Sequence, residues 1–182
     1  GVLVVGRHPV GILPVHLGAE FQLFREVGMA NFPEVVDFLS SIDNIILLLA
    51  IGILLTALVQ SSSVVTTLAI TMVVTGLIDL EQGIYLTMGS NIGSCVVALI
   101  AGFSGSLNAK RTAIIHLLFN VFGVLIFVLA GFVLSYFDIY YAAVFEALFP
   151  GVPSTQLAMF HTFFNVVTVI IMLPLTNRMV DL

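Results

Sequence analysis

Long apolar stretches separated by short charged connections make up most of the chain after residue 43. The first stretch runs from Asn44 to Ile78 without a charged residue, and its middle holds the four polar residues Gln60–Ser63 (QSSS). A bilayer core contains no water that could satisfy buried amide and hydroxyl groups, so each unpaired group is costly there. Polar residues kept at that depth indicate a binding site for a small polar solute or ion.

The length of the 44–78 stretch limits how it can cross a membrane. One span takes about 20 apolar residues, so the stretch is long for one span and short for two. Each arm beside Gln60–Ser63 would rise about 22–24 Å at ~1.5 Å per residue, less than the ~30 Å of the hydrocarbon core. The stretch predicts a re-entrant helical hairpin with Gln60–Ser63 near its tip. One long kinked helix is the alternative.

The remaining apolar segments predict three more membrane elements. Residues 82–104 are interrupted by Gly89–Ser94 (GSNIGS), and glycines with polar residues at mid-membrane predict a broken transmembrane helix. Residues 112–137 and 156–176 each predict a further span, joined by the amphipathic connection 138–155. The expected fold class is therefore an all-α integral membrane protein.

Three parts of the chain differ in character. Residues 1–37 predict an irregular or interfacial segment, with an altered or truncated start because the chain begins with Gly1. Residues 38–176 form the membrane unit, and 177–182 form a short tail.

Composition agrees with this class. Of 182 residues, 60% are hydrophobic and only 8% are charged, whereas soluble domains carry about 25% charged residues. The formal net charge of −5 is spread over short connections, and the absence of a basic run argues against nucleic acid as a partner. Cys95 is the single cysteine, and no Cys/His cluster has metal-binding spacing. The positions of Lys110, Arg111 and Arg178 relative to two spans place the loop 105–111 and the C-terminus in the cytoplasm by the positive-inside rule.

Hydroxyl and amide side chains recur at helical spacing through the QSSS motif. If the backbone stays helical there, these residues share one face: Thr56, Gln60, Ser63, Thr67 and Thr71. Their oxygens suit a hard cation such as sodium, and free N–H groups at helix ends suit an anion. The alternative is structural, since Ser and Thr also bond to carbonyls and hold membrane helices together.

Two other polar patterns have competing explanations. Gly89 and Gly93 match a GxxxG helix-packing motif, but Asn91 between them favours binding. Two similar segments, HLLFNV and HTFFNV, place His116 one turn before Asn120 and His161 one turn before Asn165. We expect these pairs to form a structural polar network, with proton relay as the alternative.

The predicted spans hold no Lys or Arg that could neutralise an anion. An anionic substrate would depend on helix ends, hydroxyls and bound cations. Sodium would supply the missing positive charge, and each charge carried inward gains about 2.3 kcal/mol per 100 mV.

Four segments resemble the sodium-dependent inorganic phosphate cotransporter family, the type II group and its bacterial relatives. They are TALVQSSSVVTT at 56–67, LTMGSNIGS at 86–94, AKRTAIIHLLFNVFGVLIF at 109–127 and FHTFFNVV at 160–167. The combination of QSSS with GSNIG about 30 residues later makes the resemblance specific, and it extends over roughly 38–176.

The resemblance implies two inverted repeats in a multi-pass protein of the inner or plasma membrane. Each repeat has its own QSSS hairpin, and inorganic phosphate and sodium bind between them. It implies a transporter rather than an enzyme, with sodium as a co-transported ligand and no other cofactor. By motif position the implied site residues are Gln60, Ser61, Ser62, Ser63, Thr66, Thr67, Ser90, Asn91 and Ser94. The implied sodium ligands are Gln60, Ser61, Ser63 and Asn91.

The chain departs from the family pattern in two ways. It has a single QSSS, so it is similar to the second repeat, and a homodimer or a partner chain with the first repeat is expected. Ser94 is followed by Cys95 and two valines, where the family often has threonines.

Sodium-coupled inward phosphate transport is thus the main hypothesis. The alternative is a non-transporting interaction or regulatory subunit, or an inactive fragment, derived from a transporter half. A hydrolase using Ser61–Ser63 with His116 or His161 is disfavoured, because the sequence has no nucleophile-elbow pattern.

Overall fold

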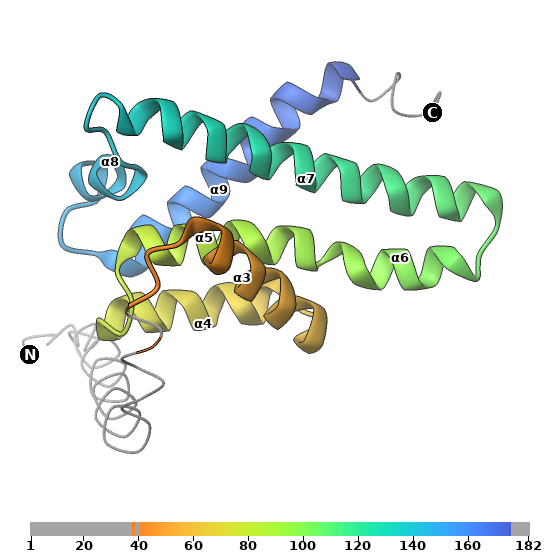
Figure 1. Cartoon of the computed structure of the whole chain (residues 1–182), viewed down its shortest axis with the longest axis horizontal. Coiled ribbons are helices and arrows are strands. Elements are labelled where there is room, and N and C mark those ends of the chain that lie inside the picture. The colour runs from red at the N-terminus through yellow and green to blue at the C-terminus, as the bar shows by residue number, and fades with distance from the viewer. Residues whose placement is uncertain (1–37, 39–40, 176–182) are drawn as a thin grey trace, which may run out of the picture.

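The computed structural model describes Phe38 and residues 41–175, and every regular element among them is helical (Figure 1). In chain order the elements are α3 (Ile45–Val59), α4 (Ser62–Thr75), α5 (Leu80–Gly93), α6 (Cys95–Phe103), α7 (Leu107–Ser135), α8 (Tyr141–Leu148), α9 (Pro153–Met172) and the 3-10 turn η1 (Leu173–Leu175). The predicted segment 1–37 and the tail 177–182 lie outside the described residues.

The stretch 44–78 folds as a helical hairpin, as predicted, and not as one kinked helix. Asn44 caps α3 by accepting a hydrogen bond from the Leu47 amide at 3.1 Å. The chain reverses at Gln60, which has left-handed backbone angles of φ 57° and ψ 26°. Ser61 then begins α4, and its hydroxyl accepts from the Val64 amide at 3.5 Å. Gln60 therefore provides the turn through its backbone, and Ser61 provides the cap of α4.

Helix α5 lies at the centre of the bundle, and all of its residues except Glu81 and Ile92 are buried. Helix α3 runs parallel to it, so that Leu49 lies beside Gly89 and Ile53 beside Gly93. A Cβ atom at Gly89 would collide with the backbone carbonyl oxygen of Leu49. The glycines of the GSNIGS segment therefore allow the backbones of α3 and α5 to touch.

The broken helix was predicted correctly, but its break is smaller than the sequence indicated. Residues Gly89–Gly93 remain helical in α5, and the interruption is confined to Ser94, which keeps right-handed helical angles. Leu80–Phe103 consequently forms a single apolar crossing of 24 residues. The glycines are used for packing against α3 and not for opening the helix.

The other two predicted spans are present with shifted ends. Helix α7 begins at Leu107 instead of 112 and is 29 residues long, and α9 covers 20 residues from Pro153. The connection between them contains the short helix α8, which buries Tyr141 and Phe145.

An aromatic cluster joins α7, α8 and α9. Phe160 of α9 packs edge-on against Phe127 of α7, with ring centroids 6.2 Å apart, and against Phe145 of α8 at 5.5 Å. Phe160 and Phe164 are almost completely buried. Such ring pairs add about 0.5–1.5 kcal/mol each beyond their burial. The cluster attaches the last helices to the bundle, and α5 presents Leu86 and Met88 to the same core.

The contact between α3 and α5 predicts that a methyl group added inside it lowers stability, whereas a larger side chain on the exposed face of α3 does not. The substitution Gly89→Ala should lower the stability of the folded chain by about 1–3 kcal/mol, because overpacked backbones must separate. Thermal unfolding in detergent, followed by size-exclusion chromatography, measures the loss. Ala50→Leu on the exposed face of α3 is the control. Equal melting temperatures for Gly89→Ala and Ala50→Leu would contradict the proposed contact.

Candidate substrate and ion site

The QSSS residues form the tip of the hairpin. Gln60 and Ser63 are exposed, and Ser61 and Ser62 are half-buried. The turn at Gln60 separates the polar stripe into two parts, so the condition of a continuous helix, under which Thr56 to Thr71 would share one face, is not met. Thr56 lies on α3 and is fully buried, whereas Thr67 lies on α4 and is exposed.

The part of the stripe on α4 forms a ladder of hydroxyl groups. Thr67 donates to the Ser63 carbonyl at 2.9 Å, and Thr71 donates to the Thr67 carbonyl at the same distance. Thr75 continues the series with a bond of 2.8 Å to the Thr71 carbonyl. Each hydroxyl satisfies its hydrogen locally and keeps its lone pairs as acceptors. The exposed residues Ser63 and Thr67 therefore turn an acceptor-rich face away from the chain's own helices.

Three buried hydroxyls without a hydrogen-bond partner lie on the hairpin and on α5. The hydroxyl oxygens of Thr56, Thr66 and Thr87 are buried and have no partner. Thr56 contacts Gly93, since its Cβ lies 2.7 Å from the place that a Gly93 Cβ would take. A buried unpaired hydroxyl destabilises a fold by about 1–3 kcal/mol. The Thr56 hydroxyl oxygen is therefore unpaired at the contact between the hairpin and α5.

The polar side chains of GSNIGS bond to carbonyl groups within α5 itself. Ser90 is fully buried and donates to the Thr87 carbonyl at 2.8 Å. The Asn91 amide donates to that carbonyl at 3.3 Å, and Ser94 donates to the Asn91 carbonyl at 2.7 Å. Thr87 is the residue of this region that the sequence analysis missed. Its only signal was a hydroxyl one helical turn before Ser90 and Asn91.

The two His/Asn pairs do not bond side chain to side chain. In each pair the Asn amide donates to the carbonyl of its own His, at 3.0 Å for Asn120 and 2.8 Å for Asn165. Asn120 also donates across helices to the Cys95 sulfur at 3.3 Å, which ties α7 to the start of α6. The His116 ring is exposed, and the Nε2 atom of His161 is buried without a partner.

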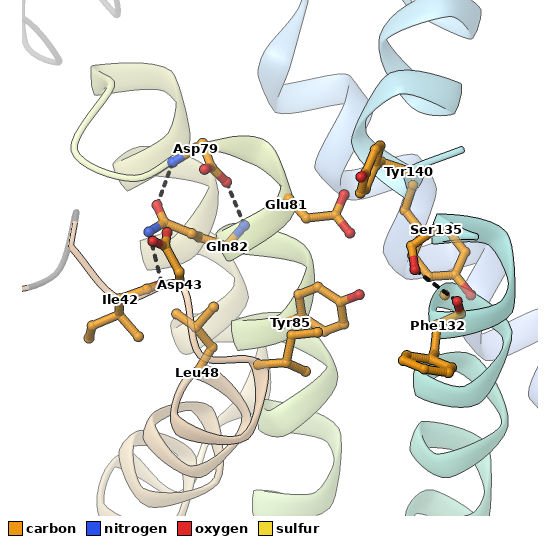
Figure 2. A pocket seen from close by; sticks show the side chains of 13 residues that line it. Ile42, Asp43, Leu48, Asp79, Glu81, Gln82, Tyr85, Phe132, Ser135 and Tyr140 are labelled. Carbon is orange, nitrogen blue, oxygen red and sulfur yellow. Dashed lines mark hydrogen bonds between the residues drawn. The ribbon is translucent and has the colours of Figure 1, made fainter. Parts of the chain in front are cut away.

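A second polar region surrounds a cavity of about 210 Å³ at the base of the hairpin. Figure 2 shows Glu81 and Tyr85 extending from α5 toward the ends of α7 and α8, with Asp43, Asp79 and Gln82 on the other side. Asp79 and Gln82 form a capping box that starts α5, with bonds of 2.7 and 2.8 Å. Gln82 also donates to the Ile42 carbonyl at 3.1 Å and so ties the entry to α3 onto α5.

Glu81 stabilises a helix far from it in the sequence. Its carboxylate accepts a hydrogen bond from the Ala142 amide at 2.9 Å and another from Tyr85. Ala142 lies in the first turn of α8, whose own N-cap residue Tyr140 supplies no side-chain bond. A carboxylate at a helix N-terminus is favourable because it meets free N–H groups and the positive end of the dipole.

Tyr141 completes this attachment. Its hydroxyl donates to the Phe127 carbonyl at 2.8 Å. Burial, followed by the negative charge of Glu81, raises the pKa of Tyr141 to about 12. Tyr141 consequently stays protonated and able to donate at neutral pH. No local sequence pattern indicates these partners, because Glu81 and Ala142 lie 61 residues apart.

Comparison with known proteins assigns the sequence to a family. The model of the Na+/Pi-cotransporter family matches residues 24–152, which include the hairpin, the broken helix and α7. The chain belongs to the Na+/Pi-cotransporter family. The chain is thus a member of a transporter family, and the described residues contain three helices long and apolar enough to cross a membrane. Family and helices together indicate a multi-pass protein of the cell membrane.

Relatives occur in bacteria and mammals. The uncharacterized protein YqeW of Bacillus subtilis is 41% identical over 129 residues, or 71% of this chain and 39% of that protein. The mouse sodium-dependent phosphate transport protein 2C is 37% identical over 59% of this chain and 18% of its own length. "Putative inorganic phosphate export protein YjbB" of Escherichia coli is 27% identical over 96% of this chain and 31% of its own length.

The chain therefore spans less than half the length of these relatives. No solved structure matches it significantly.

The role of Glu81 can be measured through the helix that it caps. Glu81→Ala should weaken α8 docking by about 1.5–3 kcal/mol, the usual value of a hydrogen bond to a charged group. Amide hydrogen exchange across 141–148 should become faster by the corresponding factor. Glu146→Ala, which removes an exposed carboxylate from α8 itself, is the control. Unchanged exchange in Glu81→Ala would mean that the carboxylate does not hold α8.

Proposed function

We propose that this chain is one repeat of a sodium-coupled transporter of inorganic phosphate. The observation that supports this most directly is the re-entrant hairpin, which presents QSSS at its tip and packs against GSNIGS of α5. Two helix ends meet at the tip, and the start of α4 offers free backbone N–H groups beside Ser61–Ser63. Such a helix start attracts an anion.

Sodium coupling is supported by the chemistry of oxygens on the hairpin and on α5. Thr56, Thr66 and Thr87 offer buried hydroxyl oxygens without partners, and hydroxyl and carbonyl oxygens are the ligands that hard cations prefer. The described residues of the hairpin and of α5 include no Lys or Arg that could neutralise phosphate. Bound sodium would supply that charge. Gln60, Ser61, Ser63 and Asn91 remain the proposed side-chain ligands from the motif.

A second repeat is required by the same proposal. Ser63 and Thr67, at the tip end of the hydroxyl ladder on α4, are exposed, whereas Thr75 at its other end is buried. A polar face at mid-membrane is favourable only where protein or a water-filled cavity covers it. The relatives are longer than the matched region, with 18–39% of their length covered. A second copy of this chain or a partner chain with the first QSSS repeat would cover the face.

Transport is tested with radiolabelled phosphate in proteoliposomes that contain this chain alone or together with a first-repeat chain. An inward sodium gradient should drive uptake, and a matched potassium gradient should not. Gln60→Ala combined with Ser61–Ser63→Ala should reduce uptake at least tenfold, because the tip then lacks its polar ligands. Ser154→Ala near the start of α9 is the control.

The same assay distinguishes the competing functions. Phosphate release under an outward sodium gradient would be measured as well, since one relative is named as an export protein. Transport that persists in the QSSS variant would refute the site assignment. An assembly that forms with the first-repeat chain but moves no phosphate would support a non-transporting subunit.

The unpaired threonines provide a sharper test of the sodium site. Thr56→Val keeps the shape and removes the hydroxyl, so it should stabilise the sodium-free fold by about 1–3 kcal/mol. It should also raise the sodium concentration for half-maximal uptake about tenfold.

Thr168→Val is the matched control, because Thr168 is also buried and unpaired but packs against Gly123 of α7. This variant should stabilise the fold and leave the sodium dependence unchanged. Equal sodium dependence in the Thr56 and Thr168 variants would contradict a site at the hairpin.

A further inference from the structure

Charged residues in the described part of the chain are sorted to opposite ends of the bundle. The acidic ones lie before α3, at the start of α5, and in or just before α8: Asp43, Asp79, Glu81, Asp138 and Glu146. Figure 1 shows the α4–α5 and α7–α8 connections at one end and the α6–α7 connection at the other. Lys110 and Arg111, the Lys and Arg residues of the described part, lie at that other end in α7.

A groove opens between α6 and α7 beside these two cations. It has a volume of about 100 Å³ and is lined by Leu99, Gly102, Phe103, Lys110, Ala113 and Ile114. Gly102 brings the helices close together, since an added Cβ there would lie 2.8 Å from the Ala113 Cβ. The walls are apolar and Lys110 supplies the polar group. Phe103 is 77% exposed and Ile114 is 52% exposed, so the described elements leave much of these walls uncovered.

The length of α7 bears on the position of the groove relative to the bilayer. Its 29 residues rise about 43 Å, whereas the hydrocarbon core is ~30 Å thick. A helix of this length extends beyond the core, and the charges of Lys110 and Arg111 near its start favour the level of the lipid headgroups for this end. The apolar walls formed by Leu99 and Ile114 lie next to the acyl chains.

The two cations have no anionic partner within the described residues. The segment 95–135 contains neither Asp nor Glu, and no described residue forms an ion pair with Lys110 or Arg111. The start of a helix is also the positive end of its dipole, so cations there gain nothing from the helix itself. An external anion at this end would balance all of these charges.

We propose that the α6–α7 groove binds one anionic phospholipid. An acyl chain lies along Leu99, Phe103 and Ile114, and the headgroup phosphate contacts Lys110 and Arg111. Basic groups at the interface attract anionic headgroups, and the apolar walls hold the hydrocarbon. Free phosphate would gain nothing from these walls, so the shape of the groove favours a lipid. This inference is independent of the proposed phosphate transport.

The test compares phosphatidylglycerol with phosphatidylcholine of the same acyl chains. Each lipid is titrated into the full chain in detergent, and retained lipid is counted by native mass spectrometry. The wild-type chain should retain the anionic lipid preferentially. Lys110→Gln and Arg111→Gln should each reduce that preference about fivefold, the effect expected for one basic residue near an anionic surface. Lys110→Arg should restore it, because the charge is kept.

Two further variants separate the groove from net charge. Ile114→Trp fills an exposed wall without changing the charge, and it should reduce retention of phosphatidylglycerol. Ala143→Glu changes the net charge by the same one unit at the opposite end, on an exposed position of α8, and should have no effect. Size-exclusion profiles confirm that each variant is folded.

Three results would overturn the proposal. The wild-type chain could retain both lipids equally. The preference could survive in the double variant K110Q/R111Q. Inorganic phosphate could bind with the same dependence on Lys110 and displace no lipid, which would identify the cations as a site for a free anion.

Discussion

The direct backbone contact between α3 and α5 is the constraint on which the arrangement of the bundle depends. Gly52, Gly89 and Gly93 remove the side chains that would keep the two helices apart. A hairpin with arms shorter than the bilayer is stable only if its polar turn has protein beside it, because the hydrocarbon offers no hydrogen bonds. The close contact brings the hairpin against the most buried helix. It also fixes the position along α5 at which Thr56 contacts Gly93, and with it the position of the unpaired Thr56 hydroxyl.

Much of this fold could be predicted from the sequence because bilayer thickness converts segment length directly into topology. The stretch 44–78 was too short for two spans, and the hairpin followed from that limit. The detail at GSNIGS could not be obtained in the same way. Glycine is compatible with a helix break and with close helix packing, and only the position of Leu49 on α3 shows that packing applies to Gly89. The break remained at Ser94, where the helical geometry is barely disturbed.

The residue types of the candidate site were predictable from the sequence, but the contacts between those residues were not. QSSS, Ser90 and Asn91 could be identified because they are polar residues in apolar segments. Burying such groups is unfavourable, so their presence there indicates a function. The helical spacing of the polar residues did not show that Thr56 lies on a different helix from Thr67. Gln60 ends α3 because its φ angle is positive, and the spacing of side chains along the sequence does not reveal the sign of φ. Glu81 and Ala142 are joined only through the folded bundle, so no local pattern could reveal that contact. Family membership supplies the transport context for these residues.

The parallel contact of α3 with α5 also has a consequence for biogenesis. The arms of the hairpin leave the ribosome before the glycine surface on which they rest, because Gly89 follows Leu49 in the chain. Neither arm is long enough to enter the bilayer as an ordinary span. The surface on which the hairpin rests is therefore missing until α5 has been synthesised, and the depth of the hairpin depends on a helix that follows it in the chain.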